Sequence, residues 1–336
     1  MDIAASAKRK HLRDSAQLTS SPLQVLDVDP VTFRHAFGHS PFALRHNLVP
    51  SGLFTIDRLT EIAERIIAMG KLHRISMIEG ERTAARKIVN LRPKKPTADV
   101  LSRLEHSSCW IDFIGINEFD PELDDVYRKT LQDVKFLVGT QAVGDVRRGQ
   151  MNVFVASPQM VTPYHFDHGH NFLCQIANEK SAWLWEPDDR EILPHPEIED
   201  FYLEAWDRSR RKSGFGPARE FRLQPGDALH QPSLAPHWVK NGPSVSISVA
   251  IHFSNASLER RARIYQANGV LRRVGLAPTS PGVNRVFDHL RSGIMRILAK
   301  QSPKNQDEAV WAGIRRLKKW RKRLSRLLKN SPRADS

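Results

Sequence analysis

The sequence predicts a mostly β protein with helices before the β core and an all-helical segment after it. Three observations support this class. From residue 151 onward, short apolar or alternating runs are separated by Pro, Gly and Asn, which is typical of antiparallel β structure. Apolar residues recur at helical spacing in two earlier segments, and again after residue 255. Since no long helix separates the runs of the β region, a sandwich or barrel is favoured over a parallel α/β sheet.

The composition excludes several broad classes. The 336 residues are 40% apolar, which is too rich for a disordered protein. No apolar run approaches the roughly 18 residues that a membrane-spanning helix needs. Residues 1–21 contain Lys8, Arg9 and Lys10 followed by polar residues, so we expect a disordered tail rather than a secretory signal. A reducing, cytoplasmic location is therefore expected, with Cys109 and Cys174 as small buried side chains.

The region before residue 151 alternates loops with helices. Four prolines divide residues 22–51 into pieces that predict loops and short strands. Asp57 is a candidate cap for a helix that ends at Gly70, and apolar residues at helical spacing predict a second helix over Pro121–Val138. Residues 76–95 fit neither pattern clearly.

The β region contains seven strand candidates and two turns. The turns are Asn178-Glu179 and Pro225-Gly226-Asp227. The candidate strands are Asn152–Ala156, Tyr164–Asp167, Phe172–Ala177, Ser181–Trp185, Glu220–Leu223, Ala228–Gln231 and Val245–Phe253.

The last of these strands has two very different faces. Its odd-numbered positions, such as Ile247 and Ile251, are apolar, whereas the even-numbered positions carry serines, Ala250 and His252. A row of small polar side chains suits a narrow, hydrated cavity inside a barrel. A serine-rich outer face is the alternative.

Helices are predicted over Leu258–Arg273 and Val283–Lys300, followed by a basic amphipathic helix. The segment Arg291–Lys329 holds 13 Lys and Arg against two acidic residues, and so carries 11 of the 14 net positive charges. Such a helix either contacts an anionic partner, such as nucleic acid or an acidic lipid surface, or docks on the body or on a second subunit with its basic face in solvent. Periodicity leaves both interpretations open.

Two histidines and an aspartate are candidates for a metal site. His165 and Asp167 are two apart in a predicted strand, so their side chains leave the same face, and His237 lies near the start of another strand pair. Two imidazoles and one carboxylate on a β frame form the facial triad that suits non-haem Fe(II) and leaves positions open for a chelating co-substrate and dioxygen. A His-x-Asp pair alone is weak evidence, since a chain with 14 His is expected to hold about one by chance.

Three further residues lie at spacings that suit an oxo-acid co-substrate. Thr162 precedes His165 by three residues, and Asn171 and Lys180 follow it. If a 2-oxo acid chelates the metal, its far carboxylate needs a cation and a hydroxyl donor deep in the barrel, which Lys180 and Thr162 would supply.

These residues carry a family resemblance. The stretch Thr162–Lys180, together with Pro225–Pro232 and Pro236–Val239, resembles the Jumonji-C or cupin-like Fe(II)/2-oxoglutarate oxygenases, in particular the asparaginyl-hydroxylase type and bacterial cupin-like domain proteins. The resemblance covers residues 151–253 well, and more loosely the region from Leu23. It implies a double-stranded β-helix, or jelly roll, over residues 22–256, with the barrel core at about 141–256 and a helical, basic segment at 257–330.

The resemblance also implies site roles and a reaction. His165, Asp167 and His237 would be the iron ligands, Lys180 and Thr162 would bind the far carboxylate of 2-oxoglutarate, and Asn171 would line the co-substrate pocket. Dioxygen would then oxidise 2-oxoglutarate to succinate while a C–H bond of a protein side chain or small metabolite is hydroxylated. A homodimer through the C-terminal helices is also implied.

The sequence departs from the family at several positions. His252 stands where such hydroxylases often have Asn or another small polar group, and no tyrosine matches their co-substrate tyrosine; Tyr164 is next to a ligand on the opposite face. His168 and His170 are competing ligand candidates, although the turn at Gly169 is expected to direct them out of the barrel. Two cysteines provide no zinc module of the kind common in histone demethylases.

Two other functions stay open at this point. One is a cupin-like ligand sensor without turnover, whose basic helix contacts nucleic acid. The other is a metal-dependent cupin isomerase or dioxygenase that needs no oxo acid. The sequence does not select the prime substrate.

Overall fold

The computed structural model of the chain describes residues 23–79, 89–91, 101, 104–139, 146–204, 216–299, 313–319 and 322. The predicted tail at residues 1–21 lies outside the described residues, as does most of the predicted basic helix. None of the described helices is both long and apolar enough to cross a membrane.

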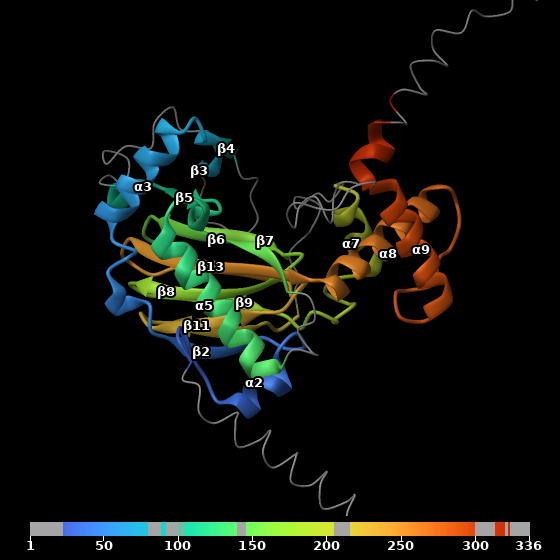
Figure 1. The fold of residues 1–336 in the computed structure, drawn as a ribbon, viewed down its shortest axis with the longest axis horizontal. Helices are drawn as coiled ribbons and strands as arrows, with labels where there is room; N and C mark the ends of the chain where they lie inside the picture. Colours follow the sequence, from blue (N-terminus) through green and yellow to red (C-terminus); the bar gives the residue numbers. More distant parts are fainter. Residues whose placement is uncertain are drawn as a thin grey trace, which may run out of the picture.

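Two antiparallel sheets form the core, as the sequence predicted (Figure 1). The large sheet has the strand order β1-β2-β11-β8-β13-β6-β5-β3-β4, and the small sheet has the order β10-β9-β12-β7. Four strands of each sheet make up the jelly roll: β6, β13, β8 and β11 in one, and β7, β12, β9 and β10 in the other. The strands are β1 (Leu26–Asp27), β2 (Phe42–His46), β3 (Ile75–Glu79), β4 (Val89–Leu91), β5 (Cys109–Phe113), β6 (Val146–Ala156), β7 (Val161–His165), β8 (His170–Ala177), β9 (Lys180–Leu184), β10 (Arg219–Leu223), β11 (Asp227–Gln231), β12 (His237–Asn241) and β13 (Ser246–Asn255).

The two faces of β13 separate as their side chains require. Ile247, Val249 and Ile251 belong to the main apolar cluster on the outer side of the large sheet. Ser246 and Ser248 are fully buried on the opposite face, where the Ser248 hydroxyl donates to Gln175 Oε1 at 3.0 Å. The serine row therefore faces the barrel interior, which confirms the first of the two interpretations.

Helices α2 (Pro30–Ala36), α3 (Ile56–Ala68) and α5 (Pro121–Val138) cover the outer face of the large sheet (Figure 1). The bounds of α5 are those predicted, because Asp120 accepts from the N–H groups of Glu122 and Leu123, and Gly139 ends the helix at φ 77°. For α3 the predicted cap was wrong. Thr55 accepts from Arg58 N, whereas Asp57 lies in the first turn. Short 3₁₀ turns lie at Val49–Ser51, Leu72–Arg74, Leu104–His106 and Ile116–Glu118.

The strand predictions need two corrections. Strand β7 ends at His165, so Asp167 lies in the following loop rather than in the strand. The region before residue 151 is richer in strands than predicted, because β3, β4 and β5 extend the large sheet beyond β6. Cys109, Ile111 and Phe113 of β5 are buried in the main cluster, and Trp110 and Asp112 face the other way.

A separate helical layer lies beside the β core (Figure 1). This layer consists of α7 (His195–Tyr202), α8 (Ala256–Arg273) and α9 (Arg285–Ala299). Residues 313–319 are also helical, and Ile314 is buried while Arg315 and Lys318 contact Glu204 at 3.0 and 3.1 Å. For this part of the basic segment, the structure favours the docked interpretation.

Candidate functional site

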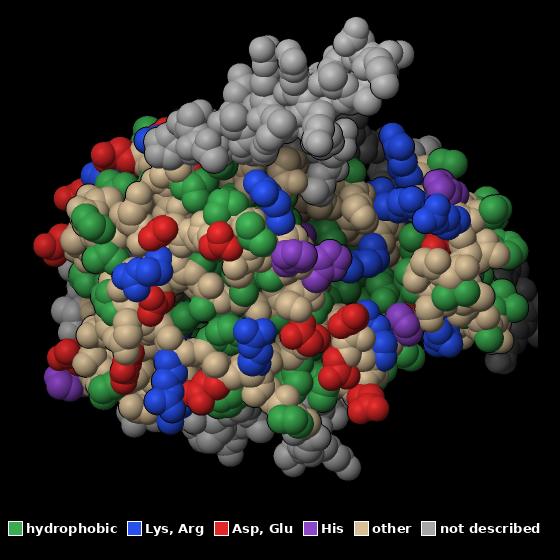
Figure 2. Space-filling view, turned by 90° about the horizontal axis from the view of Figure 1, so that it is seen from below, with side chains coloured by type: hydrophobic (Ala, Val, Ile, Leu, Met, Phe, Trp, Pro, Cys, Tyr) green, Lys and Arg blue, Asp and Glu red, His purple; other side chains and the backbone are tan. Residues whose placement is uncertain are grey.

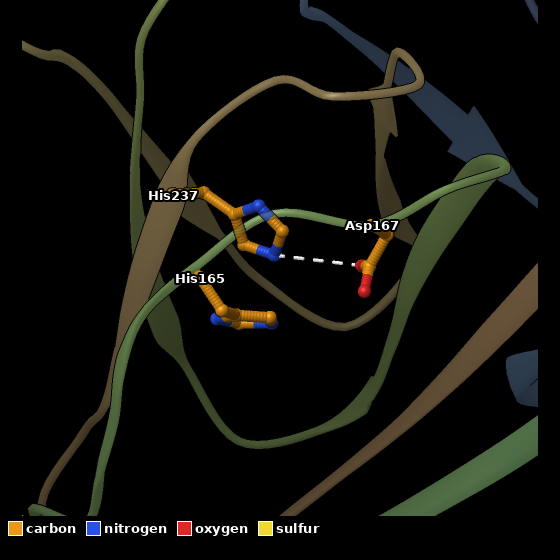
Figure 3. A group of neighbouring side chains, drawn as sticks. All are labelled: His165, Asp167 and His237. Atoms are coloured by element: carbon orange, nitrogen blue, oxygen red, sulfur yellow. Dashed lines mark ion pairs between the residues drawn. The ribbon is translucent and has the colours of Figure 1, made fainter. Parts of the chain in front are cut away.

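The three predicted metal ligands converge at one end of the barrel. His165 is the last residue of β7 and His237 is the first of β12, and antiparallel pairing sets the two opposite each other with ring centroids 4.0 Å apart. Asp167 reaches the same point from the loop after β7, and its Oδ2 lies 3.9 Å from His237 Nε2 (Figure 3). One ligand atom from each of the three residues lies within 4.8 Å of the other two.

Backbone contacts set the orientation of both imidazoles. His165 Nδ1 lies 2.8 Å from the carbonyl of Pro163, and His237 Nδ1 lies 3.0 Å from that of Ala235. Since a carbonyl oxygen accepts only, each Nδ1 carries the proton and each Nε2 keeps its lone pair. The donor set, with two neutral nitrogens and one carboxylate, therefore fits a ferrous ion.

All six predicted site residues line a single cavity of about 250 Å³. These residues are Thr162, His165, Asp167, Asn171, Lys180 and His237. The cavity thus joins the metal-ligand candidates to the co-substrate candidates. His252 lines it as well, and burial lowers the pKa of this imidazole.

Lys180 is the one cationic side chain among the described residues that line this cavity. It is the first residue of β9, it is 6% exposed, and its Nζ donates to the Ser248 hydroxyl. Burial lowers its pKa from 10.5 to about 7. An ammonium group is costly to bury without a counter-charge, so its position here points to an anionic ligand.

Asn171 and Gln231 form a buried amide pair beside the triad. Asn171 Nδ2 donates to Gln231 Oε1 at 2.6 Å, and neither Asn171 Oδ1 nor Gln231 Nε2 has a hydrogen-bond partner among the described residues. His252, Asn171 and Gln231 are aligned across β13, β8 and β11, so they form a polar row on the inner face. Sequence reasoning missed Gln231, although its place at the end of a predicted strand was a usable signal.

Asp112 is a second missed residue. It lies on β5 and lines the cavity beside Trp110 and Phe154, and its Oδ1 has no hydrogen-bond partner in the described part of the chain. Burial raises the pKa of its carboxyl from 3.8 to about 8. The alternation in Cys109–Phe113 was the available signal for this strand.

The competing histidines lie away from the triad. His168 Nδ1 is 2.8 Å from the Tyr202 hydroxyl, and the ring of His170 packs against Phe37 at 4.9 Å. Burial lowers the pKa of both imidazoles to about 3. Tyr164 lies on the opposite face from the triad, as predicted, and it packs against Trp185.

Comparison with known proteins identifies a family. The family model for the cupin-like domain matches residues 87–258, slightly more than half of the chain. No functionally curated protein matches the sequence at a significant level.

Several solved structures of YcfD, a ribosomal oxygenase from Escherichia coli, are similar to this chain. One is 12% identical and aligns with 92% of this chain and 69% of YcfD at a TM-score of 0.46. A second is 13% identical, with coverages of 91% and 69% and a TM-score of 0.48. A third, which holds cobalt and 2-oxoglutarate, is 13% identical, with coverages of 92% and 68% and a TM-score of 0.46. These values describe a distant overall likeness.

Proposed function

The chain belongs to the cupin-like domain family, and from this premise we propose that it is an Fe(II)- and 2-oxoglutarate-dependent oxygenase. The observation that carries the proposal is the presence of a His-Asp-His triad and a buried ammonium group in one cavity. A metal site alone would fit many cupin-like proteins. The buried cation adds a reason for a carboxylate-bearing co-substrate.

In this proposal His165, Asp167 and His237 hold the ferrous ion through Nε2, a carboxylate oxygen and Nε2. The carbonyls of Pro163 and Ala235 keep the two rings in place, and Leu234 N donates to the Asp167 carbonyl at 2.8 Å. When bound, the iron supplies the redox chemistry that couples oxidation of 2-oxoglutarate by dioxygen, giving succinate and carbon dioxide, to hydroxylation of a C–H bond.

The co-substrate is oriented by residues at the other side of the cavity. The ammonium of Lys180 pairs with the far carboxylate of 2-oxoglutarate, and the half-buried hydroxyl of Thr162 donates to the same group. Asn171 borders the co-substrate, and its Oδ1 has no hydrogen-bond partner among the described residues. Binding of the carboxylate stabilises the charged form of Lys180, so the pKa of its ammonium rises when the site is filled.

The test is succinate formation from 2-oxoglutarate by the full chain with iron and ascorbate under air. Wild-type protein should release succinate slowly even without its prime substrate. Lys180→Ala should abolish this release, whereas Lys240→Ala, which removes an exposed lysine from the neighbouring strand β12, should leave it unchanged.

Two other outcomes would identify the alternatives. Binding of iron and 2-oxoglutarate without succinate would favour a ligand sensor. Turnover of another substrate that is indifferent to Lys180→Ala would favour a cupin enzyme that needs no oxo acid. Asp167→Ala should weaken iron binding in every case, so it tests the metal site and not the reaction.

The same protein is proposed to form a homodimer through its C-terminal helices. Helix α9 exposes five large apolar side chains, with exposed fractions of 49–76%. They are Val286, Phe287, Leu290, Ile294 and Ile297. An exposed apolar stripe of this kind on a surface helix is typical of a protein–protein contact.

A further inference from the structure

A second cavity lies between the first turns of α8 and α9 and is rich in arginine. Its volume is about 470 Å³, and three guanidinium groups line it, those of Arg260, Arg261 and Arg285. Figure 2 shows Lys and Arg side chains gathered along the border between the β core and the helical layer. Asp288 is the one carboxylate among the described residues that line this cavity.

Other arginines of the same two helices have carboxylate partners. On α8, Arg272 contacts Glu199 at 2.7 Å and Arg273 contacts Asp200 at 3.0 Å. On α9, Arg291 lies 3.7 Å from Asp288, and this aspartate also accepts from Gly282 N at 2.7 Å. Asp288 is engaged through Oδ2, and its buried Oδ1 has no hydrogen-bond partner among the described residues. One carboxylate, which already faces Arg291, therefore stands against three arginines in the lining, so an excess of positive charge remains.

The three cavity arginines have no carboxylate within ion-pair distance in the described part of the chain. Arg261 donates to the Ser233 hydroxyl at 2.8 Å, and the Nε atoms of both Arg260 and Arg261 are buried without a hydrogen-bond partner there. Buried guanidinium N–H groups normally have an acceptor, because leaving a charged donor unpaired is costly. The described residues thus provide no acceptor for these two N–H groups.

The contact of Arg260 with His289 does not supply that acceptor. Arg260 Nη2 lies 3.2 Å from His289 Nδ1, but this imidazole Nδ1 also lies 2.8 Å from the carbonyl oxygen of Arg285. Nδ1 carries either a proton or a lone pair, and only the protonated form is compatible with a carbonyl oxygen at that distance. The Arg260 guanidinium then faces another donor.

We propose that the cavity formed by Arg260, Arg261 and Arg285 binds a phosphate group of a phosphorylated ligand. Planar guanidinium groups match the oxygens of phosphate with paired hydrogen bonds, and a phosphate dianion offers enough charge and acceptors for three of them. Ser257, in the first turn of α8, adds a hydroxyl donor to the cavity wall. The volume leaves room for an organic group attached to the phosphate.

This site is distinct from the metal-ligand cavity, with which it shares no lining residue. It borders the same end of the barrel, since the Ser233 hydroxyl that Arg261 contacts donates to the His168 carbonyl next to Asp167. The proposal does not depend on the oxygenase reaction.

The test is calorimetric titration of the full-length protein with pyrophosphate at about 0.15 M salt, where long-range charge effects are screened. Saturable binding to the wild type is expected. Arg260→Gln and Arg285→Gln should each weaken the affinity by roughly tenfold or more, since a hydrogen bond to a charged group is lost. Arg273→Gln is the matched control, because it removes the same charge from α8 outside the cavity, and its affinity should stay within about twofold of the wild type.

The proposal is overturned if the wild type shows no saturable binding, or if Arg273→Gln weakens binding as much as Arg260→Gln does. Thermal melting of each variant establishes that it is folded. Should Arg260→Gln fail to fold, Arg285→Gln carries the test, because Arg285 is exposed and has no ion pair to lose among the described residues.

Competition then identifies the source of the phosphate. A nucleoside 5′-diphosphate that displaces pyrophosphate, with no effect of an oligonucleotide bearing a 5′-hydroxyl, would indicate a terminal phosphate. Displacement by that oligonucleotide with the same dependence on Arg260 would indicate backbone phosphates. Displacement by neither compound would contradict a phosphorylated ligand.

Discussion

Replacing Lys180 with methionine should make the protein more stable while it removes binding of 2-oxoglutarate. The side chain is almost completely buried, and its ammonium contacts the hydroxyl of Ser248. Methionine fills a similar volume without a charge. Ser248 keeps a partner in the variant, because its hydroxyl donates to Gln175 Oε1.

The size of the effect follows from the pKa of the ammonium. In the folded protein, burial lowers this pKa from 10.5 to about 7. Each pKa unit corresponds to about 1.4 kcal/mol, so keeping Lys180 charged costs the folded state at most about 5 kcal/mol. The lost hydrogen bond offsets about 1 kcal/mol of the gain. We therefore expect Lys180→Met to raise the free energy of unfolding by about 3 to 4 kcal/mol.

The effect has a defined pH dependence. Below pH 7 the lysine is protonated in both the folded and the unfolded chain, so the full cost is present. Between pH 7 and 10.5 the folded protein holds a neutral amine while the unfolded chain is still protonated, and the cost falls. The advantage of Lys180→Met should therefore be largest below pH 7 and disappear near pH 10.5.

Urea denaturation at pH 6.5 and at pH 10 measures this difference, and calorimetric titration with 2-oxoglutarate in the presence of iron measures the lost binding. Lys240→Met, at an exposed position on β12, should change neither quantity appreciably. The reasoning is refuted if Lys180→Met is less stable than the wild type at pH 6.5, or if it still binds 2-oxoglutarate with unchanged affinity.

Three further predictions concern other parts of the fold. Burial raises the pKa of the Asp112 carboxyl from 3.8 to about 8, so this residue lowers the free energy of unfolding increasingly as the pH rises from about 4 to 8. Asp112→Asn should therefore leave the free energy of unfolding unchanged near pH 4 and raise it by about 2 kcal/mol or more at pH 8. Urea denaturation at the two pH values measures this difference. A Cβ at Gly149 would collide with the backbone carbonyl of His252, so Gly149→Ala should lower the free energy of unfolding by roughly 2 kcal/mol and the melting temperature by several degrees. In α9 nothing obstructs a Cβ at Gly293, so Gly293→Ala should leave the melting temperature unchanged or raise it. Leu290→Glu should convert the proposed dimer to a monomer in light scattering, and removal of residues 257–336 should give monomer or aggregate; an unchanged oligomer in either case would contradict the proposed contact through α9.

Local features of the fold were predictable because their causes are local. The bounds of α5 follow from a proline, a capping aspartate and a glycine within the helix and its ends. The two faces of β13 follow from the alternation over residues 244–253, where every odd-numbered position is apolar. The predicted cap at Asp57 was wrong because Thr55 and Asp57 are both suitable capping residues, and periodicity does not separate positions two apart.

The candidate site was predictable only in part. The sequence by itself determined which residue types were present at spacings that suit a metal and an oxo acid, namely His165, Asp167 and Lys180. Only the tertiary structure decided that His237, far along the chain, stands opposite His165, because this depends on the pairing of β7 with β12. The tertiary structure also decided which ionisable side chains are buried and so have shifted pKa values. The burial of Lys180 and Asp112 depends on all the segments that pack around them, so no local sequence pattern predicts it.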